Sequence, residues 1–61
     1  MLGEKIKELR KENKLSQEEL AEKLCVSRQS ISLWENGQTV PSFDKIVALA
    51  DFFNLYIVYS S

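Results

Sequence analysis

The chain has 61 residues, of which 44% are hydrophobic and 28% are charged, and its formal net charge at pH 7 is −1. This length suffices for one small domain, and this balance of apolar and charged residues is that of a soluble folded protein. No apolar run approaches the roughly 18 residues of a membrane span, and the N-terminus lacks a signal-peptide core. We therefore expect a cytoplasmic protein with no membrane partner.

The composition also argues against catalysis and metal binding. Cys25 is the only cysteine and histidine is absent, so the chain cannot form an intrachain disulfide and lacks the commonest metal ligand and general base. The acids Glu18, Glu19 and Glu22 are spaced as the solvated face of a helix. The sequence therefore predicts no enzyme, no metal site and no cofactor.

The first predicted helix starts near Leu2 and continues through the segment GEKIKELRKE. Leu2, Ile6 and Leu9 recur at helical spacing and form a narrow apolar stripe. Asn13 tolerates the left-handed conformation that ends many helices, so we expect this helix to stop there.

The second predicted helix begins after Ser16. This serine is a good N-cap, and Glu19 three residues later completes a capping box. Leu20 and Leu24 face the core, and the small Ala21 between them lets another helix cross closely. The pattern predicts a short helix that packs through its two leucines.

The third predicted helix follows a tight turn and begins at Ser27, again a good N-cap. Ile31 and Trp34 point to one side of it, and Asn36 and Gly37 end it because they tolerate positive φ. The opposite side carries the remaining residues Arg28, Gln29, Ser32 and Leu33. Two short helices joined in this way are typical of a helix-turn-helix, whose second helix enters the major groove of DNA.

The fourth predicted helix begins near Ser42, after a loop that ends at Pro41. Asp44 lies in its first turn, where a carboxylate favours the positive end of the helix dipole. Together with Ile31 and Trp34, a wide apolar stripe on this helix is expected to form most of the core. The members of the stripe are Phe43, Ile46, Val47, Ala50 and Phe53.

The last segment is dense in β-branched and aromatic residues from Leu55 to Tyr59 and is predicted to form a short strand there. So short a strand needs a partner, and the simplest partner is the same segment of a second copy, paired antiparallel. The alternative is that the segment continues as a distorted fifth helix. We therefore divide the chain into a DNA-binding domain, residues 1–54, and a tail for dimerisation, residues 55–61.

Taken together, these motifs resemble the helix-turn-helix of phage repressor and Cro proteins, which is widespread in bacterial regulators. The resemblance covers roughly residues 4–54 and rests on five short matches in one register: Ser16-Gln17, Leu20-Ala21, Val26-Ser27, Gln29-Ser30-Ile31 and Trp34-Glu35-Asn36-Gly37. It implies an all-α fold, a bundle of four to five helices of the lambda-repressor-like type. It also implies binding to double-stranded DNA.

The resemblance assigns roles to individual residues. Base contacts are expected from Arg28, Gln29, Ser32 and Leu33, since arginine suits guanine and glutamine suits adenine. Phosphate contacts, which fix the docking register, are expected from Gln17, Ser27, Ser30, Asn36, Thr39 and Lys45. Ser27 suits both a helix cap and a phosphate contact. Arg10 and Glu35 resemble a partly buried ion pair between the first and third helices.

The sequence departs from the family pattern at Cys25, at Leu33 and after Asn54, where many relatives carry a fifth helix that builds the dimer. Cys25 occupies the turn position where the family usually has glycine, and a left-handed backbone there would cost about 1 kcal/mol. Leu33 stands where a polar or basic residue is common. It cannot form a hydrogen bond with a base, but it can pack against the methyl group of thymine.

The expected function is that of a sequence-specific transcription regulator, a repressor that acts as a homodimer on a palindromic operator. One domain of this size makes few contacts with DNA, and two copies double the readout. Lys23 and Arg28 form a local basic patch, although the net charge of −1 predicts weak long-range steering. The alternatives are an antitoxin-like protein that binds a toxin and represses its own operon, and an adaptor that has lost DNA binding.

Overall fold

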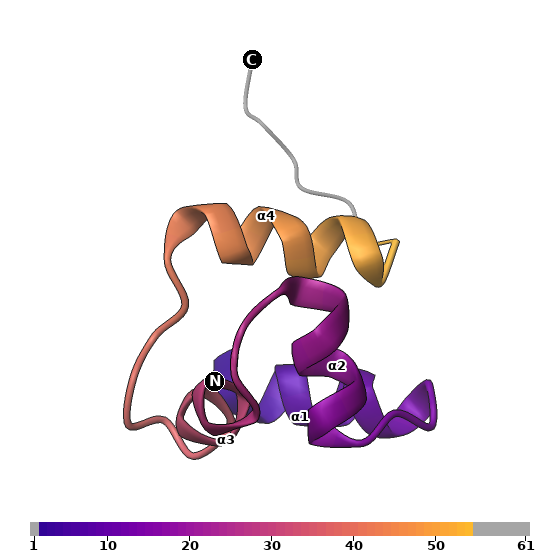
Figure 1. The fold of residues 1–61 in the computed structure, drawn as a ribbon, viewed down its shortest axis with the longest axis horizontal. Helices are drawn as coiled ribbons and strands as arrows, with labels where there is room; N and C mark the ends of the chain where they lie inside the picture. Colours follow the sequence, from indigo (N-terminus) through magenta and orange to yellow (C-terminus); the bar gives the residue numbers. More distant parts are fainter. Residues whose placement is uncertain (1, 55–61) are drawn as a thin grey trace.

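Residues 2–54, which the computed structural model describes, fold into four helices and no strand. The helices are α1 (Leu2–Glu12), α2 (Gln17–Leu24), α3 (Arg28–Glu35) and α4 (Phe43–Phe52). Helix α4 runs across one end of the molecule above α2, whereas α1 and α3 lie at the other end (Figure 1). The predicted all-α fold class is confirmed over these residues. The tail, predicted as a strand or a fifth helix, lies outside them.

The start of α2 is fixed by the predicted capping box. The Ser16 hydroxyl accepts a hydrogen bond from the Glu19 N–H at 3.0 Å, and the Ser16 N–H donates to Glu19 Oε1 at 2.7 Å. The same N–H, helped by the Ser16 hydroxyl, lowers the pKa of the Glu19 carboxyl. Two backbone donors that the helix start would leave unpaired are thus satisfied.

Helix α3 begins after its predicted N-cap, Ser27, and α4 begins after Ser42, which caps less well. Ser27 Oγ accepts a hydrogen bond from the Ser30 N–H at 3.1 Å, which is the usual N-cap geometry. Ser42 occupies the N-cap position of α4 with an extended backbone, but its side chain forms no capping hydrogen bond. The prediction of Ser27 as a cap is confirmed.

The prediction that Asn13 adopts the left-handed conformation was wrong. The next residue, Lys14, has a φ of 58° instead. Both the backbone N–H and the side-chain Nδ2 of Asn13 donate to the Leu9 carbonyl, at 3.1 and 2.8 Å. These two bonds keep Asn13 in the last turn of the helix, so the reversal of the chain falls one residue later.

The core is formed mainly by α2 and α3, with smaller contributions from α1 and α4. Its buried members are Ile6, Leu20, Ala21, Leu24, Ile31, Trp34 and Leu49, of which Leu20 and Ile31 are completely covered. The predicted stripe on α4 is corrected in part. Ala50 is buried and Phe53 packs against the core as expected, but Phe43 is 68% exposed and Leu49, outside that stripe, is buried. Most positions of α4 are apolar, so periodicity did not define which of its faces would turn inward.

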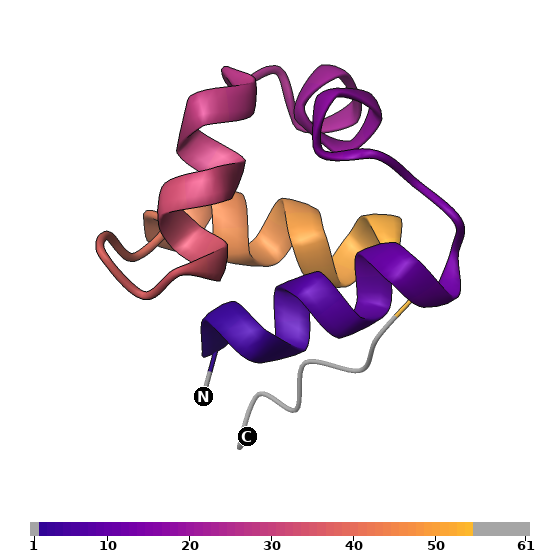
Figure 2. The same ribbon diagram turned by 90° about the horizontal axis from the view of Figure 1, so that it is seen from below.

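The start of α1 packs closely against the end of α3, as Figure 2 shows. A Cβ atom on Gly3 would lie 2.3 Å from the Trp34 carbonyl oxygen and 2.9 Å from that of Glu35. Because real atoms do not approach so closely, only glycine fits at this crossing. The crossing sets the position of the C-terminal end of α3.

Candidate nucleic-acid interface

The outward side of α3 carries the residues expected to read bases. Arg28 and Gln29 are exposed at the start of the helix, and Ser32 and Leu33 are half-buried one turn later. The other side of the helix is buried and carries Ile31, Trp34 and Glu35. The structure thus turns the four candidates away from the core, as a helix that enters a DNA groove requires.

A buried ion pair joins the end of α3 to α1. Arg10 Nε donates to Glu35 Oε2 at 2.6 Å and Arg10 Nη2 donates to Glu35 Oε1 at 3.1 Å, a bidentate geometry. Arg10 Nη1 also donates to the Leu15 carbonyl at 2.8 Å, which ties the connection between α1 and α2 to the pair. Arg10 and Glu35, expected as partners, are therefore in direct contact.

The surroundings of Glu35 keep its carboxyl ionised. Burial would raise its pKa, but the hydrogen bonds from Arg10 and Gln17, with the charges of Arg10 and Lys7, outweigh burial and hold the pKa below its ordinary value. The carboxylate accepts three hydrogen bonds in all. Such a pair fixes orientation more surely than it adds stability.

Gln17 extends this network to the start of α3. Its Nε2 donates to Glu35 Oε1 at 3.1 Å, and its Oε1 accepts from Arg28 Nη1 at 3.4 Å. Because Glu35 accepts from the amide nitrogen, the amide oxygen is turned toward Arg28. The side chain predicted to contact a phosphate therefore also helps to orient the arginine predicted to contact a base.

The remaining phosphate candidates lie around α3. Ser27 and Ser30 are in contact through their hydroxyl oxygens at 3.0 Å at the start of the helix. Asn36 and Thr39 are exposed in the loop after it. The N–H groups of Gln38 and Thr39 donate to the Leu33 carbonyl, at 2.9 and 3.4 Å, and so hold this loop against α3.

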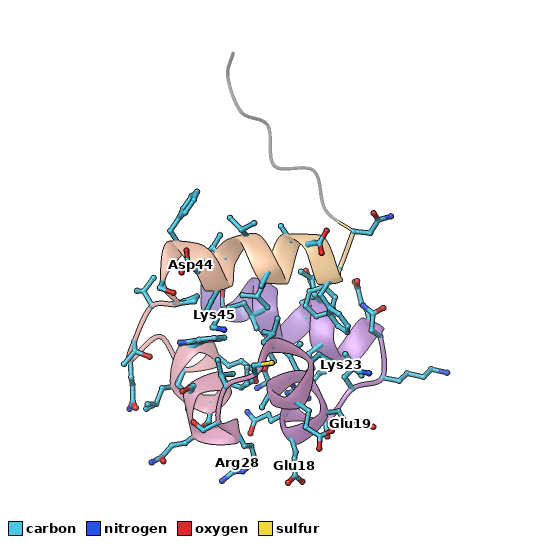
Figure 3. The ribbon with its side chains drawn as sticks, turned by 45° about the horizontal axis from the view of Figure 1, so that its top comes forward. Glu18, Glu19, Lys23, Arg28, Asp44 and Lys45 are labelled. Carbon is cyan, nitrogen blue, oxygen red and sulfur yellow. The ribbon has the colours of Figure 1, made fainter. Side chains whose placement is uncertain are left out.

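Lys45 is the candidate whose surroundings differ most from expectation. Its ammonium donates to the carbonyl of Leu24, the last residue of α2, at 2.9 Å in a partly buried position. Figure 3 shows the Lys45 label on the side of α4 that faces the other helices, whereas Arg28 lies at the opposite edge of the molecule. The Lys45 ammonium is thus bound by the backbone of α2 in the free protein.

The electrostatic character of the reading face is mixed. Arg28 and the acidic Glu18 both project from the edge opposite α4 (Figure 3), and the chain as a whole carries a net charge of −1. A carboxylate beside the arginine reduces the local attraction for phosphates. The net charge and the mixed signs at this edge give little long-range attraction for a polyanion.

Cys25 occupies the turn between α2 and α3 in a left-handed conformation. Its φ and ψ are 58° and 43°, a region that glycine adopts freely and that L-residues other than asparagine and aspartate rarely adopt. The thiol is exposed and free. Cys25 therefore has the left-handed backbone that costs a residue other than glycine about 1 kcal/mol.

Three structural roles were not anticipated from the sequence. They are the close approach at Gly3, the contact of Gln17 with Glu35, and the contact of Lys45 with α2. For Gly3 there was a signal, because glycine within a helix is costly and usually has a packing reason. The two polar contacts join residues 18 and 21 positions apart, and periodicity gives no sign of such pairs.

Two further observations concern residues 2–54. Within this part of the chain, no group of three or more acidic or cysteine side chains is placed to hold a metal ion. None of the four described helices is long and apolar enough to cross a membrane.

Comparison with known proteins places this architecture in a family. A family model described as helix-turn-helix matches residues 6–60, so the chain belongs to the helix-turn-helix family. This finding confirms the resemblance to repressor and Cro proteins. The match also extends six residues past Asn54, where the resemblance seen in the sequence ended.

Named relatives give the same picture. The chain is 43% identical over 55 residues to the HTH-type transcriptional activator BcrR of Enterococcus faecalis, covering 90% of this chain and 27% of that protein. It is 34% identical over 59 residues to the uncharacterized HTH-type transcriptional regulator YobD of Bacillus subtilis, covering 97% of this chain and 53% of that protein. The chain thus spans between about a quarter and a half of the length of these two relatives.

Proposed function

We propose that this chain is the DNA-binding part of a transcription regulator and that it reads base sequence with the outward side of α3. One observation carries the proposal: Arg28 and Gln29 are exposed at the start of a helix whose opposite side is buried in the core. The family and the names of the relatives support it.

The proposed readout follows from side-chain chemistry. Arg28 would donate to N7 and O6 of guanine, and Gln29 would form paired hydrogen bonds with adenine. Ser32 and Leu33, one turn later, would meet neighbouring bases, Leu33 through the methyl group of thymine. Five residues around the start of α2 and both ends of α3 would hold the phosphates: Gln17, Ser27, Ser30, Asn36 and Thr39.

We further infer a homodimer that acts as a repressor on a palindromic operator. Two domains related by a two-fold axis would place their α3 helices about 34–36 Å apart, one turn of DNA, and would double the number of base contacts. Repression would follow where the bound dimer covers a stretch of duplex that other proteins need.

The second candidate is an antitoxin-like protein that binds a toxin and represses its own operon. The observation in its favour is the pair of apolar side chains Val40 and Phe43, which are 74% and 68% exposed. Apolar surface of this kind often marks a site for a protein partner.

Selection of bound duplexes from a random pool, followed by affinity measurements on variants, tests the proposed readout. Arg28→Ala and Gln29→Ala should each cost about 1–3 kcal/mol on the selected operator and relax the preference at one or two base pairs per half-site. Gln17→Ala should weaken all duplexes through the lost phosphate contact and should relax the preference only at the base pair read by Arg28, which Gln17 orients. Lys5→Ala, on the surface of α1, is the control. Equal losses on all sequences for the Arg28 and Gln29 variants would show that α3 does not read bases in this orientation.

A further inference from the structure

The contact between Lys45 and the end of α2 points to a role that differs from phosphate binding. The Lys45 ammonium donates to the Leu24 carbonyl at 2.9 Å, and both groups are partly buried between α4 and α2. The two residues are 21 positions apart in the chain. The bond is therefore a tertiary contact that joins α4 to the helix-turn-helix unit.

The chemistry of the α2 terminus explains why a cation lies there. The last carbonyls of a helix have no partner within it, and here the Cys25 and Val26 N–H groups already donate to the Glu22 and Ala21 carbonyls. The Leu24 carbonyl is satisfied by Lys45 instead. A positive charge is also favoured at the negative end of the α2 dipole.

The same reasoning shows that Lys45 does not serve its own helix. It lies in the first turn of α4, where the helix dipole disfavours a positive charge. The neighbouring Asp44 is the residue that suits this end of α4. The location of Lys45 is therefore explained by α2 and not by α4.

The contact between Lys45 and Leu24 lies next to the α2–α3 turn, which sets the direction of α3. Leu24 is followed by the left-handed Cys25, and Ser27 then caps the helix that begins with Arg28. A tie that fixes the Leu24 carbonyl to α4 restricts the direction in which the chain leaves α2. That direction sets where Arg28 and Gln29 stand relative to the bases.

We infer that Lys45 is a positioning residue for DNA reading, which holds the α2–α3 turn through the Leu24 carbonyl and does not contact a phosphate. The inference rests on the proposed function for its effect on DNA, but its effect on the turn exists in the free protein. A phosphate contact and a positioning contact make different predictions about salt. Removing one phosphate contact reduces the slope of log affinity against log salt concentration by about 0.9.

The test compares Lys45→Met with Lys5→Met. Both variants lose a lysine ammonium and keep an unbranched side chain, but the Lys5 ammonium lies on the surface of α1, where it pairs with the exposed Glu8 of the same helix at 3.3 Å. Affinity for the selected operator and for a scrambled duplex is measured over a range of KCl concentrations. The temperature is one at which circular dichroism shows each variant folded, and Lys45→Gln replaces Lys45→Met if the latter does not fold.

On the proposal, Lys45→Met lowers operator affinity by up to about tenfold, because without this bond the turn is in the binding geometry for only a fraction of the molecules. Its salt slope and its affinity for the scrambled duplex match those of Lys5→Met. A slope reduced by about 0.9 with equal losses on both duplexes would identify a phosphate contact and overturn the proposal. Unchanged operator affinity would overturn it as well.

A measurement without DNA separates this proposal from the proposed function. In the free protein, the amide 1H–15N chemical shifts of residues 25–29 should change in Lys45→Met and stay unchanged in Lys5→Met. Unchanged shifts at residues 25–29 would overturn the positioning role even if the chain binds its operator. If the unsubstituted chain selects no operator, the proposed function fails, and the shifts still decide whether Lys45 holds the turn.

Discussion

At the scale of single residues, the turn between α2 and α3 depends on a backbone conformation that its side chain disfavours. Cys25 has a φ of 58°, and an L-residue in this region is less stable than glycine by about 1–2 kcal/mol. The exposed thiol forms no disulfide, so little packing offsets this strain. The chain therefore tolerates a local cost where its family usually has glycine.

Cys25→Gly should raise the free energy of unfolding by up to about 1 kcal/mol, less the extra entropy of glycine in the unfolded chain. For a domain of this size the melting temperature would rise by up to roughly 4–8 °C, and operator affinity should not change. Lys14→Gly is the matched control. Lys14 is also exposed with a φ of 58°, so it should show the same backbone effect without the loss of a thiol. A lower melting temperature for Cys25→Gly alone would show that the thiol is a packing group.

At the scale of helices, the position of α3 is set by two contacts at its C-terminal end. The ion pair of Arg10 and Glu35 joins it to α1, and the close approach at Gly3 lies beside it. Gln17 then connects Glu35 to Arg28 at the other end of α3. The residues proposed to touch DNA are thus tied to the packing of α1.

The ion pair predicts a loss of stability in acid. The pKa of Glu35 in the folded protein lies below its ordinary value of 4.5, so the unfolded chain binds the proton more readily. The stabilisation from ionised Glu35 is complete above that ordinary value and is lost as the pH falls through the lower pKa of the folded protein. Urea unfolding between pH 7 and pH 3 should show this fall, and Glu35→Gln should reduce its slope.

Variants of Arg10 and Glu35 distinguish whether the ion pair stabilises the fold or only fixes the orientation of α3. Arg10→Met leaves a buried carboxylate without its main partner and should cost about 3–5 kcal/mol, which is comparable to the whole stability of so small a domain. Replacing both residues, as in Arg10→Met with Glu35→Leu, should recover much of this loss. If the double variant is no more stable than Arg10→Met alone, the pair stabilises the fold itself and does more than fix its orientation.

Gly3→Ala tests the crossing of α1 and α3. The added methyl would lie 2.3 Å from the Trp34 carbonyl oxygen, so the helices must separate, at a cost of about 1–3 kcal/mol. Better helix propensity offsets only about 0.5–1 kcal/mol of this, and the melting temperature should fall. Lys11→Ala, at an exposed position of the same helix, should change stability little. A rise for Gly3→Ala would show that the two helices can separate freely.

At the scale of the whole molecule, the sequence predicts what is local and misses what joins distant elements. The caps at Ser16 and Ser27 were predictable because each depends on three or four consecutive residues. The buried side of α4 could not be predicted in full. Apolar residues occur on all sides of that helix, and only packing selects the side that turns inward. The partners of Gln17 and Lys45 were not predictable either, since hydrogen bonds between helices follow from how those helices cross.

The site shows the same division. The outward placement of Arg28 and Gln29 follows from helical periodicity, since Ile31 and Trp34 define the buried side. The ion pair of Arg10 and Glu35 was expected from the resemblance to a family and not from spacing. Its extension through Gln17 to Arg28 depends on how α2 packs against α3, which the sequence does not show.

The proposed assembly of two copies into a dimer depends on residues 55–61. We propose that this apolar segment pairs with the same segment of a second copy. Residues 55–59 alternate in a strand-like pattern, a lone strand of five residues is not stable in water, and residues 2–54 contain no strand to pair with it. The rival arrangement is a fifth helix, which is consistent with a family match that continues to residue 60.

Deleting residues 55–61 tests whether this segment makes the dimer. The truncated protein should sediment as a monomer, because the edge that joins the two copies is gone. Each recognition helix would then bind its half-site alone, so affinity for the palindromic operator should fall far more than affinity for a scrambled duplex. A chain that lacks only Ser60 and Ser61 is the control and should remain a dimer. If the protein without residues 55–61 stays dimeric and binds the operator normally, the two copies must meet through residues 2–54, where Val40 and Phe43 are the exposed apolar side chains available for the contact.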